Sequence, residues 1–305
     1  MSLTNFIKRP RIREAFGKYA TKDRTPGAFK TCPLLVKDAQ GPNGSAGTSF
    51  DYLARFHIAR VMSKTEIRVH RRQWISEYVQ ERSYRYSTDE GIYDIGMNEE
   101  WHEYLTGAHF EANAYIQGKG NVKWLALLVQ YMAHSDLLKR TMMGFDNRFD
   151  ACGRVAIELI EMLELFDPIE VFQPKKHVYL NPEFVIADKV GGADAELIID
   201  DRLIEIKTNN RLTLTKSTLL QLAGYVVLHD HAGIKMDDGV HHEPLSSVGI
   251  YFARHNKFVT IPLCDLFPDK GYQLFRDVFV DEIKIYEENS LKNQRLHGVG
   301  ALEDL

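Results

Sequence analysis

Residues 191–225 read GGADAELIIDDRLIEIKTNNRLTLTKSTLLQLAGY, and this segment carries the most informative pattern in the chain. It holds two apolar, β-prone runs, Ala193 to Ile199 and Arg202 to Thr208, separated by the polar pair Asp200 and Asp201. Two β-prone runs joined by a short polar break are typical of a β-hairpin. We therefore expect two adjacent antiparallel strands here.

The second run places two charged side chains on one side of its strand. Glu205 and Lys207 are two residues apart, so the strand period of two directs both to the same face and Ile204 and Ile206 to the other. Asp194, at the start of the first run, is expected to lie across the hairpin near Glu205. The pattern thus predicts two acids and a lysine close together.

Such a group suits metal-assisted hydrolysis. Mg²⁺ is commonly held by one or two carboxylates together with water and substrate phosphate oxygens, and Asp194 and Glu205 could supply these carboxylates. Lys207 could orient a metal-bound water or offset the charge that develops on a phosphorus centre. The alternative is a solvated same-face pair on an amphipathic edge strand, which an isolated E-x-K pattern would favour.

A helix is expected directly after the hairpin. Leucines and valines recur at helical spacing from Thr213 to His229, with Thr213 or Thr215 as N-cap. Gln221 and Tyr225 are four residues apart, so they project from one face of this helix.

Together these residues resemble the D…(D/E)-x-K…Q-x-x-x-Y series of the PD-(D/E)xK nuclease superfamily, in particular its RecB-type exonuclease branch. The matching residues are Asp194, Glu205-Ile206-Lys207 and Gln221-Leu222-Ala223-Gly224-Tyr225. The resemblance implies an α/β, restriction-endonuclease-like αβββαβ core with a mixed sheet and one or two Mg²⁺ or Mn²⁺ ions. It also implies that Gln221 and Tyr225 line the substrate side of the site.

The resemblance further implies the ligands of the metal. They would be Asp194, Glu205 and the carbonyl oxygen of Ile206, while Lys207 would position the attacking water. The chain departs from the family in that no proline precedes Asp194. By strand alternation Glu196 shares the face of Asp194, and we expect an auxiliary contact or a solvated position for it rather than direct ligation.

Many members of the family carry a further ligand on an early helix. The segment Gly47-Thr48-Ser49-Phe50-Asp51 offers Asp51 for this role. The alternative is a helix-surface acid paired with Arg55 four residues later, and both interpretations stay open.

Length and composition limit the classes of protein to which the chain can belong. The chain has 305 residues, of which 44% are hydrophobic, enough for one elaborated α/β domain. No apolar run reaches the roughly 18 residues of a membrane span and no signal peptide is evident, so we expect a cytoplasmic protein. Cys32, Cys152 and Cys264 are too few and scattered for a disulfide framework, a zinc cluster or the iron-sulfur cluster of some RecB-type relatives.

Charge is unevenly distributed. The net charge is −4, yet residues 1–72 carry 15 Lys and Arg against 5 Asp and Glu. The early basic cluster is consistent with contacts to DNA phosphates, or equally with a solvated arm. Its members are Lys8, Arg9, Arg11, Arg13, Lys18, Lys22 and Arg24. No phosphate-loop motif is present, so energy-driven unwinding would require a partner such as a helicase.

The predicted organisation has three parts. Residues 1–46 form a basic arm with little regular structure, residues 47–290 form the nuclease-like domain and residues 291–305 form a tail. Within the domain, residues 48–63 are the first core helix, residues 66–150 a helical insertion and residues 151–290 the catalytic core. Aromatic residues interleaved with arginines in the insertion could stack single-stranded bases, but core positions are favoured.

The remaining elements of the core follow from periodicity. The pattern predicts a helix at 151–166, the first strand at 176–184, a hairpin of 247–254 with 257–262 and a closing helix at 275–286. His229, His231, His241 and His242 flank a loop, and a solvated loop is favoured over a zinc site because their spacing matches no specific ligand pattern.

The sequence therefore predicts a Mg²⁺-dependent deoxyribonuclease, with Mn²⁺ as a substitute ion and DNA, including single-stranded DNA, as substrate. The main alternative is a catalytically silent nucleic-acid-binding module on the same fold. A metabolic or regulatory α/β domain has no positive support, because no nucleotide-binding glycine motif is present.

Overall fold

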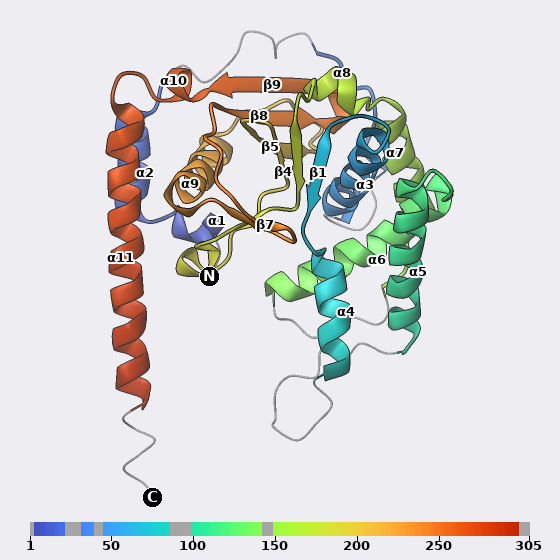
Figure 1. The fold of residues 1–305 in the computed structure, drawn as a ribbon, viewed down its shortest axis with the longest axis horizontal. Coiled ribbons are helices and arrows are strands. Elements are labelled where there is room, and N and C mark those ends of the chain that lie inside the picture. The colour runs from blue at the N-terminus through green and yellow to red at the C-terminus, as the bar shows by residue number, and fades with distance from the viewer. Residues whose placement is uncertain (1–2, 22–31, 40–44, 86–98, 142–148, 299–305) are drawn as a thin grey trace, which may run out of the picture.

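The computed structural model describes residues 3–21, 32–39, 45–85, 99–141 and 149–298. Its centre is a mixed six-stranded sheet (Figure 1). In order across the sheet, the strands are β1 (Arg68–Arg71), β2 (His177–Leu180), β4 (Leu197–Ile199), β5 (Arg202–Lys207), β8 (Ser247–Phe252) and β9 (Lys257–Pro262). The pairs β1–β2 and β5–β8 are parallel and the other neighbours are antiparallel. The α/β class expected from the sequence is confirmed.

The predicted hairpin is present as β4 and β5, joined at the expected break. Asp200 has a φ of 53°, a left-handed conformation that aspartate adopts more readily than most residues. Its carboxylate accepts hydrogen bonds from the backbone N–H groups of Lys175, Lys176 and His177, at 2.8, 2.8 and 3.1 Å. The turn residue therefore also fixes the start of β2.

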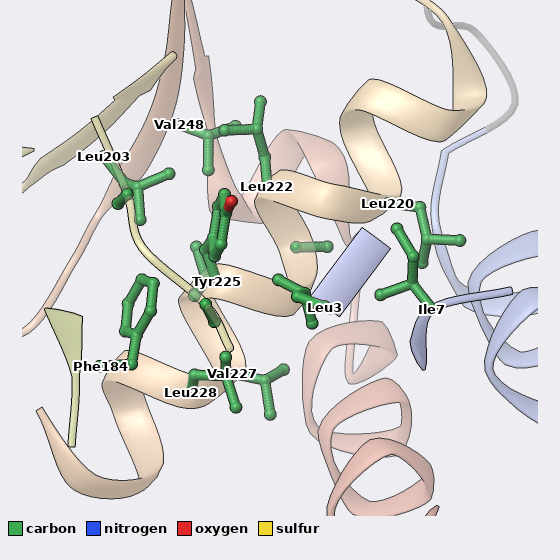
Figure 2. Close-up of a cluster of buried hydrophobic side chains, with 14 of the residues drawn as sticks. Leu3, Ile7, Phe184, Leu203, Leu220, Leu222, Tyr225, Val227, Leu228 and Val248 are labelled. Atoms are coloured by element: carbon green, nitrogen blue, oxygen red, sulfur yellow. The ribbon is translucent and has the colours of Figure 1, made fainter. Parts of the chain in front are cut away.

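One set of helices packs on one face of the sheet, and the first of two hydrophobic cores lies between them and the strands. They are α1 (Leu3–Phe6), α2 (Pro10–Tyr19), α9 (Lys216–Ala232) and α11 (Gly271–Gly298). Thr215 is the N-cap of α9, since its hydroxyl accepts from the Thr218 N–H at 3.1 Å. Figure 2 shows Leu203 and Val248 of the sheet with Leu220 and Leu222 of α9 in this core.

The second core lies on the opposite face, beneath another set of helices. They are α3 (Ser45–Met62), α4 (Ile75–Arg85), α5 (Glu99–Ile116), α6 (Val122–Thr141), α7 (Gly153–Glu164) and α8 (Pro168–Phe172). Ile204 and Ile206 of β5 are buried here, whereas Leu203 faces α9. The predicted alternation of β5 is thus confirmed. Among the described helices, none combines the length and apolarity needed to cross a membrane.

A smaller sheet lies beside the main one. Its strands are β3 (Glu183–Phe184), β6 (Ile234–Met236) and β7 (Gly239–His241), and short helical turns complete the fold at η2 (Ala187–Val190), η3 (Ala253–His255) and α10 (Leu263–Leu266). The predicted solvated histidine loop is therefore wrong in part, because the segment includes the end of α9 and the β6–β7 hairpin. His229 is buried, and burial lowers the pKa of its imidazole to about 4.

The expectation of an irregular N-terminal arm is wrong for the described part of residues 1–46. Leu3, Phe6 and Phe16 are fully buried in the first core, so apolar residues at helical spacing outweigh the basic residues between them. Gly224 of α9 permits this close packing: a Cβ there would lie 3.4 Å from the side chain of Leu3.

Three further boundaries differ from the predictions. The predicted helical insertion contains β1, which is one of the two edge strands of the main sheet. The predicted first strand at 176–184 is divided between β2 and β3, which belong to different sheets. The final helix, α11, continues through Gly298 into the predicted tail, and residues 299–305 lie outside the described residues.

A buried ion pair fixes the chain just beyond β5. Arg254 donates to the carboxylate of Glu158 on α7 and to the carbonyl oxygen of Thr208, and the other Glu158 oxygen accepts from the Ala39 N–H at 2.7 Å. Both charged side chains are almost fully buried. The pair thus connects the end of the central strand with the helices beneath it.

Replacing Arg254 by alanine should lower the free energy of unfolding by about 3–5 kcal/mol, because Glu158 would keep a buried charge without its partner. Urea unfolding followed by circular dichroism measures the change. Lys257→Ala, on neighbouring β9, is the control and should shift stability by less than about 0.5 kcal/mol. A loss below about 1 kcal/mol for Arg254→Ala would show that the pair is not structurally important.

Candidate active site

The charged end of β5 is the centre of the candidate site. Glu205 is 5% exposed, and the ammonium of Lys207 donates a hydrogen bond to its carboxylate. Both lie on the side of the strand that faces α9, as the alternation predicted. A nearly buried acid and its lysine partner therefore share one face.

Glu196 is the second acid of this group. The β4–β5 ladder ends at the pair Leu197 and Ile204, and Glu196 is the residue just before it. The Glu196 carboxylate accepts a hydrogen bond from the backbone N–H of Ile206. This bond holds the second acid against β5, next to the first.

Asp194 precedes β4 and is paired with the small sheet. It forms an isolated β-bridge with Glu183 of β3. Its carboxylate lies 3.4 Å from a guanidinium nitrogen of Arg72, and Arg72 also binds Glu183 at 2.5 Å. The charge of Asp194 nevertheless acts on Tyr225 together with those of Glu205 and Glu196, so its place near Glu205 stays a prediction.

Asp51 approaches the same group from α3. Its Oδ2 atom pairs with Arg55 at 2.7 Å, and Arg55 also donates to the side chain of Asn181 at 2.9 Å. The i,i+4 pair is thus present, but Asp51 is only 9% exposed and is not a surface acid. Its charge acts on both Glu196 and Lys207. A third carboxylate therefore reaches the site from the opposite helical layer.

The pKa shifts of Glu196 and Lys207 indicate an excess of negative charge around these two side chains. Burial, followed by the charges of Glu205 and Asp51, raises the pKa of Glu196 well above its usual range. Burial alone would lower the pKa of Lys207, yet Glu205 and Glu196 outweigh it and raise that pKa. Lys207 is therefore protonated, and the neighbouring acids would gain from a further cation.

These donors fit a hard divalent ion. Asp51, Glu196 and Glu205 offer carboxylate oxygens, which Mg²⁺ and Mn²⁺ accept as ligands. Asp194 and the carbonyl oxygen of Ile206 remain predicted ligands.

Gln221 and Tyr225 lie together on α9, as their spacing predicted. Gln221 Nε2 donates to the Tyr225 hydroxyl at 3.0 Å, and the tyrosine ring stacks on Phe184 with centroids 5.2 Å apart. Burial, with Glu205 and Glu196 next, raises the pKa of Tyr225. Figure 2 shows Tyr225 among the buried side chains around α9. The tyrosine is thus next to the acids, and a contact with substrate stays a prediction.

Part of the basic cluster is engaged within the protein. Arg9 and Arg11 both bind Glu282 of α11, at 2.5 and 2.8 Å. Lys22 and Arg24 lie outside the described residues. Two of the predicted phosphate contacts therefore have a structural partner.

Comparisons with protein-family models, with curated proteins and with solved structures found no match for this chain.

Proposed function

We propose that the protein is a metal-dependent nuclease that hydrolyses DNA phosphodiester bonds. The proposal rests on three carboxylates that act on one lysine. They come from α3, from the residue just before β4, and from β5. Two bases, Lys207 and Arg55, leave part of the negative charge of these three acids uncompensated. Three acids around Lys207 and Arg55 fit a site that also takes a divalent cation.

The order of elements supports the same proposal. If insertions are set aside, α3, β2, β4, β5, α9 and β8 follow one another along the chain, a helix–strand–strand–strand–helix–strand succession. This is the αβββαβ order of the family that the sequence resembles. Asp51 lies on the first helix of that order, Glu196 just before the second strand and Glu205 on the third strand. Gln221 and Tyr225 lie on the second helix.

Each of these residues would have a separate role in hydrolysis. Glu205 and Glu196, with Asp51, would hold Mg²⁺, which when bound lowers the pKa of water and offsets charge on the phosphate. Lys207 stays protonated because its neighbours raise its pKa, so it serves as a cation and hydrogen-bond donor rather than as a base. It would orient the attacking water and stabilise negative charge on phosphate oxygens.

Melting of the purified protein with and without Mn²⁺ tests the metal site. We expect Mn²⁺ to raise the melting temperature of the wild type and to leave that of Glu205→Ala unchanged, because ions that bind only the folded state stabilise it. Glu161→Ala, which removes an exposed acid on α7, should behave as wild type. An equal shift in all three proteins would place the ion elsewhere.

Cleavage assays then separate a nuclease from a binding module. Linear, circular and single-stranded DNA are incubated with the protein under Mg²⁺ and under Mn²⁺. Hydrolysis that requires the ion and is lost in Glu205→Ala supports the nuclease. DNA binding without any hydrolysis would favour the silent module.

A further inference from the structure

A second group of metal-ligating side chains lies where the small sheet meets the edge strand β1. His70 of β1, Asp238 of the β6–β7 turn and His241 of β7 each offer one ligand atom, and these atoms lie within 4.8 Å of one another. Nδ1 of His70 is 2.5 Å from one Asp238 oxygen, and Nε2 of His241 is 3.0 Å from the other. Three donors from two sheets thus converge on one point.

We propose that His70, Asp238 and His241 form a binding site for Zn²⁺ or a similar transition-metal ion, distinct from the candidate active site. Zinc–nitrogen and zinc–oxygen bonds of about 2.0–2.1 Å in a tetrahedral site place neighbouring ligand atoms about 3.3 Å apart. The observed separations, from 2.5 Å to at most 4.8 Å, bracket this value. Small movements of the side chains would therefore complete the site.

The chemistry of the donors selects the kind of ion. Two imidazoles and one carboxylate suit Zn²⁺, whereas Mg²⁺ prefers oxygen ligands alone. The side chains of His70 and His241 are 11% and 18% exposed, while that of Asp238 is 53% exposed. The imidazoles are thus held within the protein and the carboxylate borders solvent, which leaves a fourth position open to water.

The surroundings of His70 match those of a metal ligand. Its second ring nitrogen, Nε2, is 3.0 Å from Nδ1 of His177, so one imidazole nitrogen can face the ion while the other is hydrogen bonded. The ring of Tyr179 stacks on His70 at 4.6 Å and meets His241 edge-on at 5.0 Å. Tyr179 therefore packs against both imidazole rings of the cluster.

The ion would join the two sheets. The Asp237 N–H already donates to the Arg71 carbonyl oxygen at 3.1 Å, and the Gln73 N–H donates to Asp237 at 3.2 Å. A bond from each sheet to one cation would strengthen this junction. Arg72, which binds Asp194, is the residue directly after β1. A bound cation would therefore also restrict the movement of Arg72.

Zn²⁺ titration of chelator-treated protein tests the site. Glu205→Gln serves as the background, because it weakens the candidate active site and leaves this cluster intact. In that background we expect one equivalent of Zn²⁺ to bind and to raise the melting temperature. Adding Asp238→Asn or His241→Ala should weaken binding at least tenfold, and His177→Gln about 10- to 100-fold through His70.

Two controls keep the result interpretable. His231→Ala removes an exposed histidine at the end of α9 and should leave Zn²⁺ affinity unchanged. Asp238 is half exposed, so Asp238→Asn should fold normally, which circular dichroism verifies. The proposal is overturned if the Glu205→Gln protein binds no Zn²⁺, or if Asp238→Asn and His241→Ala both bind it as well as that protein does. Because cleavage is not the readout, either result leaves the nuclease proposal untouched.

Discussion

Replacing Lys207 by alanine should lower Mg²⁺-dependent cleavage of DNA by roughly 10²–10³-fold, the usual cost of removing one donor that stabilises developing charge. The Lys207 ammonium is held beside Glu205 and stays protonated because Glu205 and Glu196 raise its pKa. The loss should appear in kcat rather than in KM, since the contact strengthens as charge builds on the phosphate.

The same substitution should leave the fold intact. The Lys207 side chain is 28% exposed and lies at the end of β5, so alanine creates no core cavity. Without the ammonium the neighbouring acids repel one another, so the metal-free variant should melt at a lower temperature and Mn²⁺ should restore part of the loss. Lys235→Ala, at the one exposed residue of β6, is the matched control. Full cleavage activity in pure Lys207→Ala would rule out the proposed role.

The part of the fold that local pattern could predict is the part built from short-range contacts. The hairpin follows from two β-prone runs around Asp200 and Asp201, and α9 follows from its Thr215 cap. The two faces of β5 follow from strand alternation alone. For these elements the deciding interactions lie within about ten residues along the chain.

The missed elements depend on partners far away in the sequence. β1 is a four-residue strand whose pairing joins Arg68 to His177, and no local pattern marks it within a largely helical region. The small sheet likewise pairs Glu183 with Lys235. Because the His70 cluster needs both of these associations, the spacing of His241 and its neighbours gave no sign of it.

The contact that holds Glu196 lies beyond the regular hairpin. A two-residue turn at Asp200 and Asp201 fixes the register as far as Leu197 and Ile204, where the ladder ends. Just outside it, the Glu196 carboxylate accepts a hydrogen bond from the Ile206 N–H. Strand alternation predicts only that Glu196 shares the face of Asp194, so this side-chain contact with β5 could not be predicted from the pattern.

Comparing Glu196→Gln with Asp194→Asn should show which acid the proposed metal site requires. We expect Glu196→Gln to lose cleavage by roughly 10²-fold or more and to lose the Mn²⁺ melting shift, because its carboxylate is held against β5 and feels the charge of Glu205. Asp194→Asn should keep the shift and lose less than tenfold in cleavage, since its ion-pair partner is Arg72. Both changes keep side-chain size, so each serves as the other's control.

Without metal, the effect of Glu196→Gln on the melting temperature should have the opposite sign. The pKa of Glu196 is raised in the folded state, so the folded protein binds more protons than the unfolded chain between about pH 4.3 and that raised value. Stability from this group is therefore lost as pH rises through the window. Gln mimics the protonated acid, so Glu196→Gln should melt above wild type at neutral pH without metal and below it with saturating Mn²⁺. If Asp194→Asn showed that crossover instead, the carboxylate at the metal would be Asp194 despite its place beside Arg72.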